Sequence, residues 1–199
     1  MKHLFIFGIL LVLSFQSISQ DTIQPIKSIG VSALLPWVNN YSYYDYESQS
    51  STSKSGFIGV GASVFYKSGK NKFSLNFGLT GSLPYPIGPY DYAANSKRTE
   101  IQSIFLEGLY HRKITGRINI ISGLNLIEYR YDYINGVDTS IYYSKYDNTM
   151  GLTIGGEFCF TKNSSVGLLY RPTIRNFGQP GYRHLISLEL RFDFNFWKF

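Results

Sequence analysis

Phe73-Ser74-Leu75-Asn76-Phe77-Gly78-Leu79-Thr80 alternates large apolar residues with small or polar ones at every second position. Successive side chains of a β-strand point to opposite faces, so this stretch predicts a strand with one apolar face and one small, polar face. The same period of two recurs in seven other segments, at 29–35, 58–66, 103–110, 118–126, 150–160, 166–174 and 186–196. The pattern therefore predicts an all-β chain with eight strands.

The connections between these segments alternate in length. Four are long, at 36–55, 84–99, 128–148 and 175–183, and three are short, at 67–72, 111–117 and 161–165. Outer-membrane barrels have an even number of antiparallel strands, long outer loops and short periplasmic turns. We therefore predict an eight-stranded antiparallel up-and-down transmembrane β-barrel with four long outer loops and three short periplasmic turns.

The two faces of the strands indicate which solvent each one meets. The face opposite the Phe, Leu, Ile and Val residues is rich in Gly, Ser and Thr and poor in Lys, which suits the narrow interior of an eight-stranded barrel better than a water-exposed surface. We expect the apolar face to contact outer-membrane lipid. An exported soluble barrel of lipocalin type, which would bury its apolar face around a ligand, is the alternative fold.

The N-terminus has the features of a secretion signal. Met1-Lys2-His3 is basic, residues 4–15 are almost wholly apolar, and Ser17-Ile18-Ser19 supplies small residues for cleavage. The twelve-residue apolar run is shorter than the roughly 20 residues of a membrane-spanning helix. We expect residues 1–19 to be a signal peptide, residues 20–199 to be the barrel domain, and the outer membrane of a Gram-negative bacterium to be its location.

The net charge of +6 is unevenly distributed. The long connections carry seven acidic and seven basic residues, whereas the short ones carry seven basic residues and no acid: Lys67, Lys70, Lys72, Arg112, Lys113, Arg117 and Lys162. Cations at that end suit anionic lipid headgroups. Few aromatic residues lie between them, which disfavours nucleic acid as a partner.

The four-hairpin layout, the aromatic C-terminal strand and Thr99-Glu100-Ile101-Gln102-Ser103-Ile104-Phe105-Leu106-Glu107-Gly108-Leu109-Tyr110 together carry a family resemblance. The chain resembles the small eight-stranded outer-membrane barrels of OmpX and OmpA type and, more narrowly, the PorT-like outer-membrane β-barrel domain family. It departs from that pattern at Gln102, where the family often has Pro. It also departs at Trp197-Lys198-Phe199, where the alternation breaks, so the end of the last strand is expected to be frayed or bulged.

Charged residues at inward positions are few and invite a catalytic interpretation. From the turn centres, Glu157 and Arg171 are expected to be neighbours, as are Arg171 and Glu189. We predict a structural ion-pair cluster that closes the lumen, in which each charge offsets the desolvation of another. Its members are Glu107, Glu157, Arg171, Glu189 and Arg191.

No catalytic residue, metal ligand or cofactor site is predicted. His111 begins a turn and is expected to be solvated, and His184 is three residues from Ser187, so the two face opposite sides of one strand. Cys159 is the single cysteine, which leaves no internal disulfide and no zinc cluster. The acidic residues of 128–148 lack the compact loop and Gly turn of a calcium site.

Tyrosines gather at the long connections. Rings at the loop bases suit a membrane interface, whereas those at the tips suit recognition. Candidate binding residues are Tyr43, Tyr44, Tyr46, Tyr131, Tyr133, Tyr142 and Tyr143. We predict a non-enzymatic, monomeric barrel with a plugged lumen that presents these loops to an unidentified extracellular or envelope partner. A narrow channel and a barrel enzyme acting on lipid are the alternatives.

Overall fold

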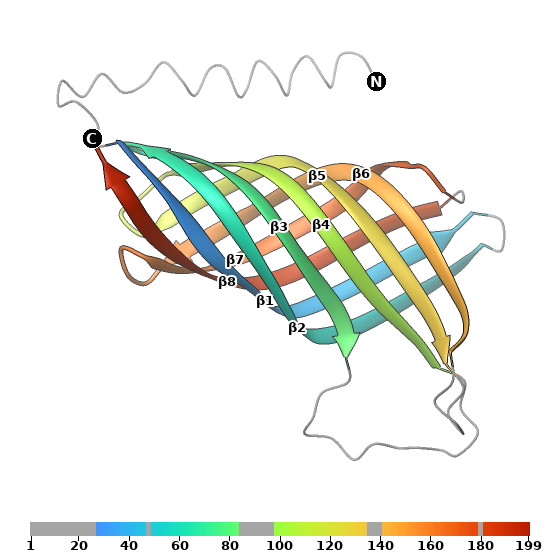
Figure 1. The fold of residues 1–199 in the computed structure, drawn as a ribbon. Coiled ribbons are helices and arrows are strands. Elements are labelled where there is room, and N and C mark those ends of the chain that lie inside the picture. The colour runs from blue at the N-terminus through green and yellow to red at the C-terminus, as the bar shows by residue number, and fades with distance from the viewer. Residues whose placement is uncertain (1–26, 47–48, 84–97, 135–140, 179–180) are drawn as a thin grey trace, which may run out of the picture.

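The computed structural model describes residues 27–46, 49–83, 98–134, 141–178 and 181–199 (Figure 1). The expected signal peptide at 1–19 lies outside this part of the chain. The eight strands are β1 (Lys27–Asp45), β2 (Ser50–Ser68), β3 (Asn71–Leu83), β4 (Arg98–Lys113), β5 (Ile118–Ile134), β6 (Ile141–Cys159), β7 (Ser164–Asn176) and β8 (Gly181–Lys198). In the residues described, no helix is long and apolar enough to cross a membrane.

Each strand pairs antiparallel with its neighbours in the chain, and β1 also pairs with β8, so the sheet closes (Figure 1). Closure gives every strand two hydrogen-bonded neighbours across the barrel wall, which is what lipid requires of a spanning sheet. The predicted eight-stranded antiparallel barrel is confirmed.

The apolar face points outward, as predicted. Leu75, Phe77, Leu124 and Leu168 are each more than half exposed, and they lie on β3, β5 and β7. The alternate positions, among them Asn76, are buried inside. This orientation is the reverse of what the soluble lipocalin-type alternative requires.

The alternation predicts an interior filled by small and polar residues, but the structure also has large apolar side chains there. Large apolar side chains occupy inward positions in two clusters, one around Phe105 and one around Leu109. Gly78 makes room for the first, because a Cβ on Gly78 would overlap the Phe105 ring. Phe105 and Leu109 are apolar residues at inward positions, which explains why the alternation of their segment is imperfect.

The strands reach farther than the sequence predicted, so most of two expected long connections is strand. β1 and β2 pair as far as Asp45 and Ser50, and β5 and β6 as far as Ile134 and Ile141. Nineteen residues of strand span about 60 Å, whereas about 9–11 tilted residues cross a bilayer. The two hairpins therefore project beyond the membrane. These segments are rich in Tyr and Ser and contain few of the aliphatic residues by which the other strands were found.

The C-terminal end of β8 is bulged and continues the strand. Ile29 lies opposite Trp197 and Gly30 opposite Asn195, so Phe196 is the extra residue. Beyond it, Lys27 and Phe199 exchange two backbone hydrogen bonds of 2.9 and 3.0 Å. The bulge absorbs the break in alternation and keeps the seam with β1 closed.

Candidate functional site

A charged pair crosses the lumen between β4 and β7. Arg171 donates hydrogen bonds from Nε and Nη2 to the two carboxylate oxygens of Glu107, at 2.6 and 3.1 Å, and both side chains are fully buried. Thr153 donates to the same carboxylate at 2.6 Å. The Phe105 ring packs against the guanidinium, with 5.0 Å from Cζ to the ring centroid.

Two residues of β8 extend this pair into a chain of charges. Nη2 of Arg171 lies 3.5 Å from Glu189, and Arg191 donates to the other oxygen of Glu189 at 3.0 Å. Nε of Arg191 lies 3.7 Å from Glu157. Opposite charges thus alternate through the lumen from Glu107 to Glu157, and the five predicted cluster residues lie in one network.

One expected pair within the network does not form. Glu157 lies opposite Gly167 on β7, and Arg171 is four residues farther along that strand, about 13 Å away. The predicted register of β6 against β7 is wrong because the centre of the turn between them was placed one residue too late in the sequence. Arg171 therefore binds Glu107 across the lumen, while Asn119 and Ser165 donate to Glu157, each at 2.7 Å.

The expectation that His111 is solvated is wrong. It points into the lumen and is only 1% exposed. Its Nε2 lies 3.0 Å from Ser74 Oγ and 3.2 Å from Arg191, and its Nδ1 lies 3.5 Å from Glu157. A hydroxyl, an imidazole and a carboxylate from three strands are thereby brought together.

His184 has a different environment on the outer wall. Its ring lies 5.6 Å from the rings of both Tyr170 and Tyr182, whose hydroxyls are 2.9 Å apart. Its Nδ1 has no hydrogen-bond partner among the described residues, and Ser187 is buried on the other face of the strand. These three rings are placed as an interfacial aromatic group.

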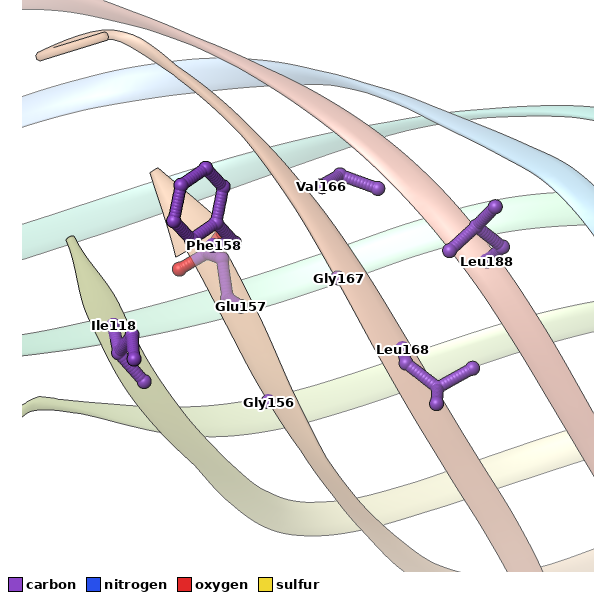
Figure 2. Close-up of a pocket in the computed structure, with 8 residues that line it drawn as sticks. All are labelled: Ile118, Gly156, Glu157, Phe158, Val166, Gly167, Leu168 and Leu188. Carbon is purple, nitrogen blue, oxygen red and sulfur yellow. The ribbon is translucent and has the colours of Figure 1, made fainter. Parts of the chain in front are cut away.

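The wall also has an apolar hollow of about 350 Å³ (Figure 2). Phe158, Leu168 and Leu188 lie around Gly156, which leaves an outward position without a side chain. Lipid chains can fill such a depression, so it does not need a ligand of its own.

A second buried ion pair lies toward the outer end. Arg183 donates to Asp147 at 2.5 Å and to the hydroxyl of Tyr131 at 3.0 Å. The Tyr43 ring lies 4.4 Å from the guanidinium. The sequence predicts both charges in long connections, at 128–148 and 175–183, and that prediction is wrong, since Asp147 and Arg183 lie on β6 and β8. Arg183 shares the inward alternation of Leu185, Ser187 and Glu189.

This arrangement changes the candidate binding surface. Tyr131 is 7% exposed and points inward, so its assignment to a loop surface is wrong, and Tyr43 is half-buried beside it. Tyr44 and Tyr46 are exposed, with ring centroids 5.6 Å apart. The side chains of Tyr133, Tyr142 and Tyr143 lie outside the part that the structure describes.

The fold is that of known small outer-membrane barrels. Neisserial surface protein A has 16% sequence identity and a TM-score of 0.52, and the match covers 84% of this chain and 99% of that one. Ail, the attachment invasion locus protein of Yersinia pestis, solved in complex with the heparin analogue sucrose octasulfate, has 9% identity and a TM-score of 0.53, covering 86% and 100%. No family model matches the chain, and no curated protein does.

The resemblance to barrels of OmpX and OmpA type is confirmed at the level of fold. The chain has the eight-stranded barrel fold of this outer-membrane class. Its narrower assignment to the PorT-like family stays a prediction.

The network makes a prediction for stability. Arg171→Met leaves Glu107 without its buried cationic partner and leaves Glu189 with Arg191 alone, so it should lower the free energy of unfolding by about 3–5 kcal/mol. Arg171→Met combined with Glu107→Gln should recover roughly 2 kcal/mol, because it removes both charges of the central pair. Urea titration in lipid vesicles, followed by fluorescence of Trp37 and Trp197, measures both. Arg175→Met, an exposed change on the same strand, is the control, and a double variant no more stable than the single one would contradict the assignment.

Proposed function

We propose that this chain is a non-enzymatic outer-membrane protein whose plugged barrel holds two projecting hairpins for binding a partner. The observation that carries the proposal is the uneven pairing at the outer end. β2 pairs with β1 out to Ser50, but its pairing with β3 ends at Phe57. In the described residues, the edge of β2 from Ser50 to Gly56 therefore has no strand beside it.

The other hairpin has a similar edge. β6 pairs with β5 out to Ile141, whereas its pairing with β7 ends at Thr149, beyond which Asn148 accepts one backbone hydrogen bond from Phe177. Among the residues that the structure describes, no strand lies beside this other edge of β6 from Ile141 to Tyr146. An unpaired strand edge offers backbone donors and acceptors to an extended segment of another protein. Exposed Tyr44 and Tyr46, at the tip of the first hairpin, add large contacts at low entropic cost. These features support a protein partner that is bound by strand addition.

The lumen supports a role as scaffold rather than as pore. The Glu107–Arg171–Glu189–Arg191–Glu157 network crosses it, and Phe105 and Leu109 add apolar bulk. An eight-stranded barrel is narrow enough for side chains to fill. The lipid-facing wall and the fold support location in the outer membrane, with residues 1–19 removed as a signal peptide.

Ser74, His111 and Glu157 supply the observation behind a second candidate, a lumen hydrolase. Their order of contacts is that of a nucleophile, a base and an orienting acid. Two features count against it. Arg191, 3.2 Å from Nε2, opposes the imidazolium that a base must form, and the neighbouring backbone N–H groups of β3 and β4 are used in strand pairing rather than free for an oxyanion.

The partner-binding proposal is tested by shortening a hairpin. In one variant a two-residue Asn-Gly turn joins Tyr41 to Lys54, which are opposite each other. A panel of immobilised proteins is first screened for one that retains cells displaying the native chain. Cells displaying the shortened variant should not attach to that protein, while the heat-dependent gel mobility of the variant stays native. Tyr44→Ser with Tyr46→Ser should weaken attachment several-fold, and Tyr66→Ser, an exposed change at the opposite end, should not. Equal attachment by native and shortened barrels would contradict the proposal.

The plugged lumen is tested by planar-bilayer recording. The purified native monomer should give no large, stable single-channel steps, because the Glu107–Arg171 pair occupies the centre of the lumen. Glu107→Ala with Arg171→Ala removes both side chains and should raise the conductance. Large, stable steps from the native protein would move it to the channel class.

The hydrolase candidate is tested with p-nitrophenyl butyrate. If Ser74 and His111 serve only the internal network, the native barrel and the Ser74→Ala variant should hydrolyse the ester at the same background rate. Ser63→Ala, another buried inward serine, is the matched control. A native rate roughly 100-fold or more above that of Ser74→Ala, with Ser63→Ala unchanged, would establish the hydrolase.

A further inference from the structure

The turn end of the barrel opens into a polar basin of about 1290 Å³. It lies opposite the projecting hairpins and is lined by all three short turns and by the end of β8. Its lining contains eight basic residues and two acidic ones, Glu157 and Asp193. The basic residues are Lys67, Lys70, Lys72, Arg112, Lys113, Arg117, Lys162 and Lys198.

Both acids of the basin already have cationic partners. Asp193 accepts hydrogen bonds from Lys72 at 2.8 and 2.6 Å, and from Ser32 at 2.7 Å. Glu157 belongs to the network with Arg191 and His111. In the described part of the chain no ion pair is formed by the remaining rim cations. The basin thus has a formal excess of six positive charges, and both of its acids are already paired with cations.

The strand register concentrates part of this charge in one row. Lys67 lies directly opposite Lys72, and Ser28 lies opposite both Lys67 and Lys198. Directly opposite residues share a face of the sheet, with Cβ atoms about 5 Å apart, and like charges in that relation destabilise it. Asp193 compensates Lys72, whereas Lys67 and Lys198 line the basin and form no ion pair with any residue that the structure describes. A bound anion would relieve this repulsion.

We propose that the basin binds a compact anion with several phosphate groups. Lysine ammonium groups are flexible point charges that suit phosphate without requiring a fixed planar geometry. One phosphate cannot neutralise cations on three separate turns, whereas linked phosphates can contact several at once. Cations that converge around a hollow favour a molecule inside it over a flat surface. Such phosphates can come from a soluble oligophosphate or from the headgroups of anionic lipid.

Calorimetry on the folded full chain in amine-oxide micelles, with inorganic tripolyphosphate as the probe, tests the site. The native protein should bind the probe more tightly than inorganic phosphate, and added salt should weaken binding through screening. Lys67→Gln with Lys198→Gln should weaken binding by about ten-fold or more. Lys54→Gln, the same change at the outer end of β2, is the control. Absence of binding at low salt, or an equal loss in the control, would overturn the proposal.

A second double variant guards against misfolding of the first. Arg117→Gln with Lys162→Gln alters two exposed turns and should also weaken binding by several-fold. Heat-dependent gel mobility shows that each variant is folded, and a folded variant of either kind that binds as the native chain does would count against the site.

Nanodiscs separate the two sources of phosphate. If the natural ligand is soluble, tripolyphosphate should bind equally in phosphatidylcholine discs and in discs containing phosphatidylglycerol. If lipid headgroups enter the basin, phosphatidylglycerol should compete and weaken binding of the probe. Both results support a phosphate site and differ only in its source.

Discussion

Backbone hydrogen bonding in lipid is the constraint on which the rest of this structure depends. Each unpaired N–H or C=O in the hydrocarbon costs several kcal/mol, so the β1–β8 seam must close. Eight strands enclose an interior that is narrow enough for side chains to fill, and the inward-facing residues fill it. The bulge at Phe196 shows how strongly closure is imposed, because the chain accepts an irregular strand end and still pairs Lys27 with Phe199.

The lumen meets that requirement with layers of charge. Along β8 from the outer end, Arg183, Glu189, Arg191 and Asp193 each join a buried or half-buried ion pair. Burying such pairs is expensive and often less stabilising than burying apolar groups. Their geometry does fix relative strand positions, because a slip of one residue would turn each charge toward lipid. The layers therefore favour one register over its neighbours.

The sequence predicted the number of strands and the lipid-facing side because both depend on local alternation. It predicted the membership of the charged network for the same reason, since Glu107, Arg171 and Glu189 occupy inward positions. The pairing inside that network depends on register. An error of one residue in a turn centre led to the prediction of a Glu157–Arg171 pair, whereas Arg171 binds Glu107. His111 was misplaced because it lies where a strand passes into a turn, and alternation does not show how far the lumen wall continues.

The two ends of the barrel differ in which polar groups they leave exposed. At the outer end, strands continue past the membrane, and within the described parts of the chain the outer edges of β2 and β6 have no strand beside them. The groups left over there are neutral backbone donors and acceptors, which suit a protein strand. At the turn end, the strands stop early and the groups left over are lysine and arginine side chains around a hollow, which suit an anion. Buried ion pairs lie between the two ends, and in the plugged lumen that we propose they separate the two surfaces. An occupant of one end would then have no direct contact with the other, so binding at either end can be altered independently.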